Sequence, residues 1–416
     1  MTTLPELTRA FARIGILSFG GPAAQIALMH RELVDEKQWV TEEEYLSALS
    51  FCMLLPGPEA MQLATWIGWR KHGTIGGLIA GGLFVLPGAL IVLALSMIYV
   101  AWGSLPLVAA LFTGVQAAVL AVVVEALLRV SKRALKSRAQ WMIAALAFVA
   151  LFCFAAPFPA VILAAGLWGF FTAVAAGSAA TTPTTSAPWA ESSRAAIIWG
   201  AVWLVPLGLI LLTAPAILGQ IALFFSKLAL LTFGGAYAVL TWMAQDVVQQ
   251  KQWLTLPQMM DGLGLAETTP GPLILVTEFV GYLAAAKDGV LMGLAGAAVT
   301  LWMTFAPCFL WIFAGAPWIE RLTHAPRLSQ ALKAITAAVV GVIANLSLWF
   351  AAHVIFASVR PITFGPLHLI WPDPTSLKLL PTALALLAAQ LLLRRHWPLP
   401  VVLGLCALIS AALAAF

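Results

Sequence analysis

Charged side chains are scarce in this chain. Aspartate, glutamate, lysine and arginine make up 9% of the 416 residues, whereas hydrophobic residues make up 62%. Soluble domains carry roughly 25% charged residues, so this chain lacks the polar surface that a folded protein of its size needs in water. Many of its stretches exceed the ~20 apolar residues that cross a bilayer as a helix. The composition therefore predicts an all-α polytopic membrane protein.

Paired cysteines and known catalytic patterns are also missing. The four cysteines lie alone in apolar segments and form no C-x-x-C pair, so the sequence predicts neither a zinc site nor a disulfide framework. No H-E-x-x-H, G-x-S-x-G or P-loop pattern is present, and the six histidines are scattered. The basic residues form no sustained stripe of the kind that binds nucleic acid. We therefore expect no enzyme activity, no cofactor, no metal and no nucleic-acid partner.

The chain contains one unit twice. Three motifs recur in the same order and with the same offset, which chance would not produce. The matching pairs are LSFGGPAAQIALM (17–29) with LTFGGAYAVLTWM (231–243), KQWVT (37–41) with KQWLT (251–255), and PGP (56–58) with PGP (270–272). The predicted division is an N-terminal repeat over residues 1–176, a linker and an extra transmembrane helix over 177–216, and a C-terminal repeat over 217–416.

Each copy has the same predicted order of segments. A segment carrying FGG is followed by a polar loop with KQW, a segment broken at PGP and four long apolar helices. The long helices are expected near 74–101, 106–128, 139–155 and 158–176 in the first copy, near 288–316, 332–356, 377–393 and 397–415 in the second, and near 195–216 between them. This gives about nine full transmembrane helices and four interrupted or re-entrant segments.

The extra helix predicts that the two copies are inverted. If each copy crosses the membrane an even number of times, one added crossing turns the second copy upside down. The strongest basic loop lies within residues 129–138, and placing it in the cytoplasm brings most of the 22 basic residues to that side. We therefore expect a multi-pass inner-membrane protein with a cytoplasmic N-terminus and a periplasmic or extracellular C-terminus.

The repeated breaks predict a binding site. Proline and glycine free backbone groups that hydrocarbon cannot satisfy, so such breaks must be buried in protein or line a wet cavity. A helix that begins after each PGP would present unpaired amides and a partial positive charge, which bind anions. Inverted repeats place such breaks together near the membrane midplane. The candidate substrate-binding residues are Phe19, Gly20, Gly21, Pro22, Pro56, Gly57, Pro58, Gln62, Gly234, Gly235, Thr269, Pro270, Gly271 and Pro272.

Other polar or kinked positions have simpler alternatives. Gln62 could bond a substrate oxygen or only another helix. The prolines at Pro87, Pro206 and Pro307 are interpreted as ordinary helix kinks, because they belong to no repeated break.

Four titratable residues are candidates for proton coupling. Glu59 follows the first PGP, and Glu267 and Glu278 flank the second. A carboxylate at bilayer depth costs several kcal/mol unless it is protonated or paired, which suits a proton carrier. Glu59 could instead only favour the start of its helix. His30 could titrate near neutral pH or serve as a packed or snorkelling side chain.

The segments FGGPAAQIALMHRE, LLPGPEAMQLATWIGWR and the later FGG…TTPGP resemble the chromate ion transporter family in its long, two-domain form. The resemblance covers nearly the whole chain. It implies a secondary transporter that exports chromate, a tetrahedral oxyanion, coupled to protons or to exchange with another oxyanion. Sulfate, another anion or a lipid head group is the alternative substrate. The expected partners are the oxyanion and the bilayer, with a homodimer as an open alternative.

The sequence departs from this pattern at three positions. Family members often have a small or hydroxyl residue where this chain has Glu59. The second copy has Ala236 where the first has Pro22, and Leu273 where the first has Glu59. The two halves are therefore not functionally equivalent, and the acid at position 59 could alter the preference for substrate charge.

Overall fold

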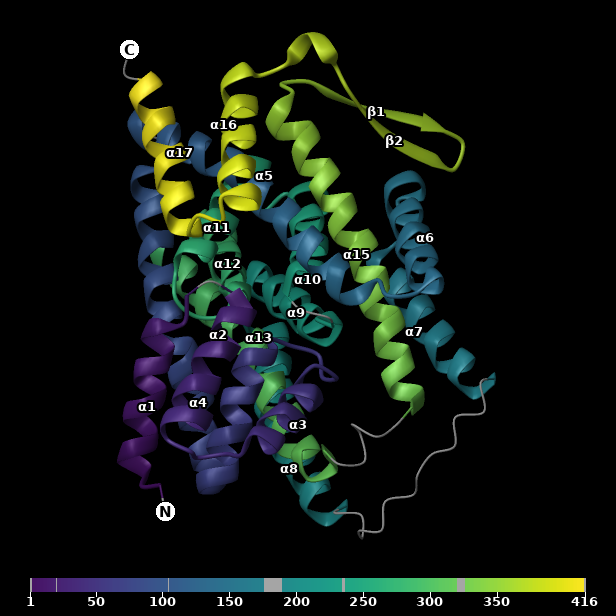
Figure 1. The fold of residues 1–416 in the computed structure, drawn as a ribbon. Helices are drawn as coiled ribbons and strands as arrows, with labels where there is room; N and C mark the ends of the chain where they lie inside the picture. The colour runs from purple at the N-terminus through teal and green to yellow at the C-terminus, as the bar shows by residue number, and fades with distance from the viewer. Residues whose placement is uncertain are drawn as a thin grey trace. The chain divides into compact units, whose positions relative to one another are not determined.

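A computed structural model describes residues 2–19, 21–103, 105–175, 189–233, 236–319 and 326–414 of the chain (Figure 1). The first copy forms α1 (Leu4–Leu17), α2 (Gly21–His30), the π-helical turn η1 (Arg31–Glu36), α3 (Glu42–Cys52), α4 (Glu59–Trp102), α5 (Pro106–Ala134), α6 (Arg138–Phe154) and α7 (Phe158–Ala175). The extra helix α8 (Trp189–Thr213) follows.

The second copy repeats this order. It forms α9 (Ala216–Leu231), α10 (Ala236–Gln245), the π-helical turn η2 (Asp246–Gln250), α11 (Leu256–Thr268), the 3₁₀ turn η3 (Leu273–Leu275), α12 (Val276–Ala286), α13 (Val290–Gly315), the 3₁₀ turn η4 (Ala316–Trp318), α15 (Pro326–Ile355), strands β1 (Val359–Phe364) and β2 (Leu367–Pro372), the 3₁₀ turn η5 (Pro374–Ser376), α16 (Leu379–Ala389), the π-helical turn η6 (Gln390–Arg394) and α17 (Leu399–Ala414).

The helices confirm the predicted all-α polytopic membrane class. Each of the nine long apolar segments expected from the sequence contains a described helix, although several helix ends differ from the expected bounds by a few residues. Five described helices are long and apolar enough to cross a membrane, and six shorter ones are also apolar. Large apolar side chains such as Leu212 and Leu291 are more than 80% exposed, as expected where lipid is the neighbour.

One element is new with respect to the prediction. The segment between α15 and α16 forms an antiparallel hairpin of β1 and β2, in which Phe364 pairs with Leu367 and Val359 pairs with Pro372. Gly365 has a φ of +57°, which lets the chain turn between the strands. The hairpin is only a short connection between α15 and α16, and the other named elements are all helical, so the all-α class still applies.

The contacts divide the chain into two compact units that do not follow the repeats. The first unit comprises Met1–Val100, Ala179–Val239 and Leu265–Ala325, and the second comprises Ala101–Ser178, Leu240–Gly264 and Pro326–Phe416. Each unit therefore takes segments from both copies. The division into an N-terminal and a C-terminal repeat remains a prediction about the sequence, and the two repeats are not separate compact bodies.

The two copies nevertheless share local geometry. Each KQW motif ends a π-helical turn with a left-handed glutamine, since Gln38 and Gln252 both have a φ of +51°. The amides of Trp39 and Trp253 then donate back to carbonyls within η1 and η2, at 2.8 and 3.0 Å. The same conformation at equivalent positions shows that the repeated letters encode a repeated turn.

The first unit is built on two helical hairpins. The merged helix α4 is interrupted at His72 and Gly73, where φ is −137° and +59°. Its first arm, residues 59–71, packs back on its second arm, residues 74–102. Gly68 lies against the backbone of Gly76, and the Met61 side chain lies against Gly81. At ~1.5 Å per residue the first arm is about 20 Å long, which is too short for a hydrocarbon layer of ~30 Å.

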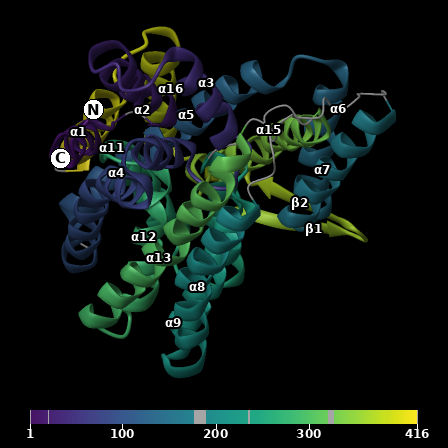
Figure 2. The same cartoon turned by 90° about the horizontal axis from the view of Figure 1, so that it is seen from below.

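The second hairpin is formed by α12 and α13. These helices pack together after a turn in which Gly289 has a φ of +111°, and Gly281 lies against Gly296 and Thr300. Helix α13 also contacts α8 and α9, as Figure 2 illustrates. The core around these hairpins includes Phe84 and Phe279, which are at most 1% exposed.

The second unit is a bundle around α5 and α15. Helix α15 packs on α5, α6 and α7, while α16 and α17 pack on α5. Gly114, Gly169 and Gly341 lie directly against backbone atoms of a neighbouring helix. Small residues at such crossings allow the helix backbones to approach closely.

We expect Gly68→Ala to destabilise the protein, because the new Cβ would lie 2.6 Å from the Ala80 Cβ and against the Gly76 carbonyl. Overpacking of this kind costs about 1–3 kcal/mol. Gly82→Ala on the second arm of the same hairpin is the matched control, since a Cβ there meets nothing within 4 Å. The free energy of unfolding in detergent should fall only for Gly68→Ala, and equal values for the two variants would contradict this packing.

Candidate functional site

The breaks of the two copies are bonded to each other crosswise. We call Pro56–Pro58 and Pro270–Pro272 the PGP turns. The Gly57 amide donates to the carbonyl of Thr232 at 2.8 Å, and the Gly271 amide donates to the carbonyl of Ser18 at 2.8 Å. Ser18 and Thr232 are the residues that precede FGG in the first and second copies. Each PGP turn is therefore held by the FGG break of the other copy.

The two residues that accept these bonds both carry a hydroxyl group. Ser18 and Thr232 are fully buried, and their hydroxyls donate to the carbonyls of Ile14 and Leu228 at 2.7 Å in both cases. Each hydroxyl thus satisfies a carbonyl at the end of its own helix, where intrahelical donors run out. The sequence analysis missed both residues, although a hydroxyl residue before FGG in both copies was a visible signal.

Glycine is required in the middle of each PGP turn. Gly57 has a φ of +128° and Gly271 has a φ of +92°, in the region that disfavours L-residues with a side chain. A Cβ on Gly57 would lie 2.7 Å from Gln62 Nε2 and 2.9 Å from Cys308 Sγ. A Cβ on Gly271 would lie 2.9 Å from Leu275 Cδ1. Both backbone conformation and space therefore select glycine.

Two helix prolines are each followed by a residue that lies against a PGP turn. Pro87 lies inside α4 and Pro307 lies inside α13. The residue after each proline faces the PGP turn of the other copy. A Cβ on Gly271 would lie 3.5 Å from the Gly88 Cα, and Cys308 is the neighbour of Gly57. The sequence analysis did not anticipate this role for Gly88 and Cys308.

Each PGP turn is also bonded by one buried glutamine. Gln62 Nε2 donates to the Pro56 carbonyl at 2.8 Å. Gln25 Nε2 donates to the carbonyls of Gly271 at 2.6 Å and Ser18 at 3.2 Å. The two side chains are at most 1% exposed, and the Oε1 atom of each has no hydrogen-bond partner among the described residues. Gln62 was predicted as a site residue, whereas Gln25 was missed.

The remaining predicted residues of the FGG breaks are only partly described. Phe19 is 44% exposed, and its amide donates to the Leu17 carbonyl at 2.9 Å. Gly21 begins α2 with a φ of +77°, and Pro22 follows in the first turn. The predicted residues Gly20, Gly234 and Gly235 lie outside the described residues.

The remaining predicted residues of the PGP turns are buried or bonded. Pro58 and Pro270 are buried. Thr269 is 5% exposed and donates to the Ala266 carbonyl at 3.2 Å. The Pro272 carbonyl accepts from the Leu275 amide at 2.9 Å.

The three candidate carboxylates lie at helix ends beside the PGP turns. Glu59 is the first residue of α4 and is partly buried, so it also fits the alternative of favouring a helix start. Glu267 is 8% exposed in the last turn of α11. Glu278 lies in the first turn of α12, is 1% exposed, and has no hydrogen-bond partner for either carboxylate oxygen among the described residues.

His30 belongs to a different, charged cluster. Its Nε2 lies 2.5 Å from Glu42 Oε2 and its Nδ1 lies 3.4 Å from Asp35 Oδ2, while its ring meets the edge of Tyr45. The hydrogen bond with Glu42 raises the pKa of His30. Its partners come from η1 and α3 rather than from the breaks, so the structure gives His30 a pairing role at the KQW loop.

This cluster predicts a pH-dependent contribution to stability. Because the folded pKa of His30 is raised, its stabilisation is fully present below the ordinary histidine pKa of about 6.5 and is lost as pH rises through the folded value. Glu42→Gln should remove most of this dependence, as measured by melting temperature against pH. Glu43→Gln, an exposed neighbour on the same helix, should retain it. Identical pH profiles for the two variants would refute the assignment.

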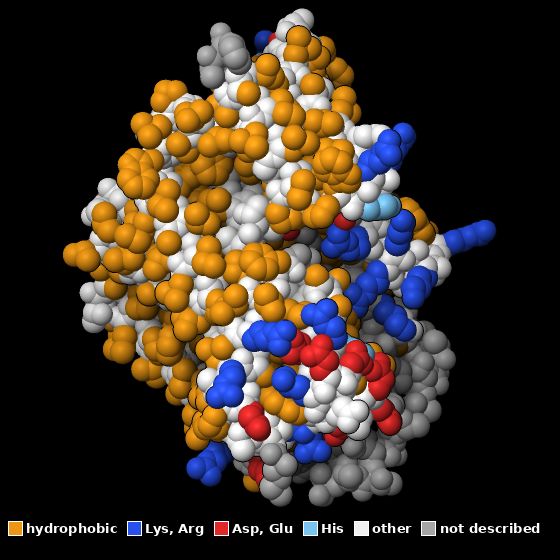
Figure 3. All heavy atoms as spheres, turned by 60° about the vertical axis from the view of Figure 1, so that its left-hand side comes forward, with side chains coloured by type: hydrophobic (Ala, Val, Ile, Leu, Met, Phe, Trp, Pro, Cys, Tyr) orange, Lys and Arg blue, Asp and Glu red, His pale blue; other side chains and the backbone are white. Residues whose placement is uncertain are grey.

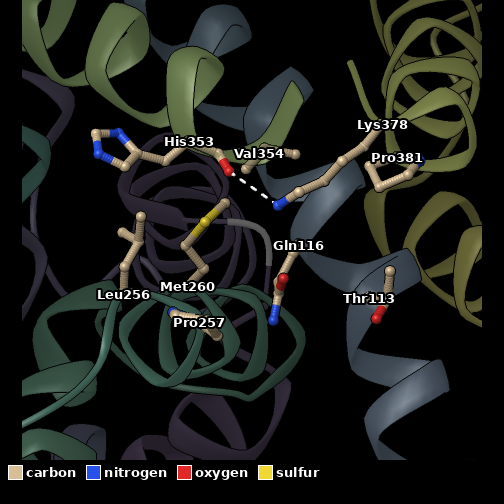
Figure 4. Close-up of a pocket in the computed structure, with 9 residues that line it drawn as sticks. All are labelled: Thr113, Gln116, Leu256, Pro257, Met260, His353, Val354, Lys378 and Pro381. Carbon is tan, nitrogen blue, oxygen red and sulfur yellow. Dashed lines mark hydrogen bonds between the residues drawn. The ribbon is translucent and has the colours of Figure 1, made fainter. Parts of the chain in front are cut away.

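A separate cavity of about 160 Å³ lies within the second unit (Figure 4). Its lining residues are Thr113, Gln116, Leu256, Pro257, Met260, His353, Val354, Lys378 and Pro381. Lys378 Nζ donates to the His353 carbonyl at 3.4 Å, and Gln116 Nε2 donates to Asp261 Oδ1 at 2.8 Å. None of the predicted site residues lines this cavity. Asp261, at 3% exposure, is a buried acid that the sequence analysis missed.

A comparison with known proteins matches two segments of the chain, one in each repeat. The family model described as "Chromate transporter" matches residues 5–170 and 219–411, leaving out the segment that contains α8. A "Probable chromate transport protein" of Synechococcus elongatus is 33% identical, with 82% of this chain and 83% of that protein covered.

Two further relatives have the same extent. A "Chromate transport protein" of Cupriavidus metallidurans is 31% identical and one of Pseudomonas aeruginosa is 35% identical, each covering 82% of this chain, with 81% and 79% of the relative covered. No solved structure matches the chain.

Proposed function

Because this chain belongs to the chromate transporter family, we propose that it is a secondary transporter that exports chromate across the inner membrane. Its relatives are named as transport proteins, in agreement with the prediction of a transporter rather than an enzyme. The observation that carries the proposal is the crosswise bonding of Gly57 to Thr232 and of Gly271 to Ser18, which joins the breaks of both copies in one compact unit.

The membrane setting is supported by composition and surface. Hydrophobic side chains cover most of the face in Figure 3, and the charged side chains gather in a limited part of it. We propose an inner-membrane location, inverted copies, a cytoplasmic N-terminus and a periplasmic or extracellular C-terminus, on the distribution of basic residues. A homodimer stays a prediction.

The proposed anion site uses helix starts rather than cationic side chains. In α4 the Gln62 amide bonds to the Pro58 carbonyl, so this bond is the first i→i−4 bond of the helix and the amides of Ala60 and Met61 precede it. Such an end carries a partial positive charge of about +0.5. Among the described residues, the buried set includes no lysine or arginine that could take this role.

The two PGP turns lie along the same helical arm. Met61, just after the first turn, meets Gly81 of α4, and Gly271 of the second turn is the neighbour of Gly88. The rise from Gly81 to Gly88 is about 10 Å at ~1.5 Å per residue. This spacing supports a shared site for one small oxyanion between the two turns.

Proton coupling is the proposed driving force, with exchange for another oxyanion as the alternative. Glu278 is the strongest carrier candidate because it is buried without a hydrogen-bond partner for its carboxylate among the described residues. A charged carboxylate in such a place costs several kcal/mol, so it favours the protonated form. Glu59 and Glu267 flank the same turns and are further candidates.

The site itself is tested by Gly57→Ala. The variant would strain a left-handed backbone and press a Cβ on Gln62 and Cys308. We expect chromate flux in proteoliposomes to fall at least about tenfold, which corresponds to about 1.4 kcal/mol. Gly289→Ala is the matched control, because its φ of +111° carries the same backbone strain in open space. An equal loss of chromate flux in Gly57→Ala and Gly289→Ala would contradict a specific role of the first PGP turn in transport.

Coupling is tested by Glu278→Gln, which keeps the shape of the side chain and removes its proton exchange. We expect flux driven by an imposed pH gradient to fall about tenfold or more, while exchange between equal chromate pools continues. Asp288→Asn, an exposed acid just after the same helix, should behave like the unmodified protein. Undiminished gradient-driven flux in Glu278→Gln would exclude this residue as the carrier.

A further inference from the structure

The two PGP turns share a chemical feature that an anion site does not by itself require. At each turn a buried glutamine uses its NH₂ group on backbone carbonyls, Gln62 on Pro56 and Gln25 on Gly271 and Ser18. Carbonyls only accept hydrogen bonds, so the amide nitrogens must face them and the orientation of both side chains is fixed. The atom left over at each turn is therefore an acceptor, Oε1.

These two acceptors are costly unless a donor reaches them. Each side chain is at most 1% exposed, and neither Oε1 has a partner among the described residues. A buried polar atom without a hydrogen bond costs roughly 1–3 kcal/mol. Glu278 adds two more buried oxygens without partners in the same unit. The unpartnered side-chain oxygens near the breaks therefore favour a ligand that donates a hydrogen bond over one that only accepts.

The first copy supplies both glutamines. The second copy has Val239 and Val276 at the positions equivalent to Gln25 and Gln62, and both valines are fully buried. Gln62 reaches the turn of its own copy, whereas Gln25 reaches the turn of the other copy through the crosswise pairing. Each PGP turn therefore has one glutamine acceptor, although both glutamines come from the first copy.

We infer that the site takes its oxyanion as a protonated monoanion, with helix-start amides binding the charged oxygens and a glutamine Oε1 accepting from the O–H group. This inference rests on the proposed function and names its substrate class. A dianion in the same place would set its lone pairs against those of Oε1, which electrostatics disfavours in a site of low dielectric.

The inference separates oxyanions of nearly the same shape. Chromate takes up a proton near neutral pH, whereas sulfate and selenate do so only in strong acid. All three oxyanions are tetrahedral, so a site that recognises only shape and charge would bind chromate, sulfate and selenate with similar affinity. A site that requires an O–H donor should bind chromate and discriminate against selenate and sulfate throughout the neutral range.

The test is calorimetric titration of the purified full chain with chromate, selenate and sulfate at several pH values above and below neutral. We expect the chromate Kd to rise about tenfold per pH unit once hydrogen chromate is the minor species, since only that species binds. Selenate and sulfate should bind at least about tenfold more weakly near neutral pH and lack this slope. Equal affinity for chromate and selenate would overturn the inference.

The same experiment distinguishes protonation of the substrate from protonation of side chains in the protein. The titratable residues beside the breaks are Glu59, Glu267 and Glu278, with Cys308 at the Gly57 turn. A proton taken up by any of them would act on every oxyanion alike. A parallel slope for chromate and selenate would therefore assign the proton to the protein and contradict the inference, whereas a slope for chromate alone supports it.

A variant pair tests the glutamine directly. Gln62→Met removes the acceptor at similar length, so the preference for chromate over selenate should fall severalfold. Val276→Ile, at the equivalent position of the second copy, adds one methylene and should keep the preference. An unchanged preference in folded Gln62→Met would overturn the assignment of Gln62, and if that variant does not fold, the pH series on the unmodified chain decides.

The outcomes also separate the two levels of proposal. If none of the three oxyanions binds at any pH, the proposed transport function fails and the inference fails with it. If chromate and selenate bind with equal affinity and pH profile, oxyanion transport stands and only the protonated-substrate inference is lost.

Discussion

In hydrocarbon, a backbone amide or carbonyl without a partner is costly, and the structure depends on how its helix breaks meet that constraint. Neither copy pairs the glycine amide of its own PGP turn. The glycine amide of each PGP turn is bonded to the carbonyl before FGG in the other copy, through Thr232 and Ser18. A single copy would leave these groups unpaired, which gives a physical reason for two copies in one chain and for a compact unit that draws segments from both.

The elements around the breaks serve this exchange of hydrogen bonds. Short helical arms lie next to the PGP turns and fold back as hairpins, and close glycine contacts hold each hairpin together. The residues after two helix prolines, Gly88 and Cys308, face the turns of the opposite copy. Gln25 and Gln62, both from the first copy, place one glutamine at each PGP turn. Glu59 has no equivalent acid in the second copy, where Leu273 stands at that position.

Much of the fold could be predicted because the length of apolar runs and the recurrence of motifs can both be read directly from the sequence. The long helices and the helix start at Glu59 follow from apolar runs and from proline. The hairpin of β1 and β2 could not be predicted in the same way, since its short strands have no repeat partner and their pairing is a non-local choice. Ser18 and Thr232 were missed because the shared hydroxyl before FGG does not by itself reveal that the carbonyl of that residue meets the PGP turn of the other copy.

The sequence by itself determined the membrane class, the positions of the long helices and the repeated breaks, because apolar runs and motifs can be read from the order of residues without knowing how the chain packs. Only the tertiary structure decided which break meets which. The bonds from Gly57 to Thr232 and from Gln25 to Gly271 join residues far apart in the sequence, and their geometry exists only after the hairpins have packed. The direction in which each glutamine amide points is fixed by those same packed carbonyls.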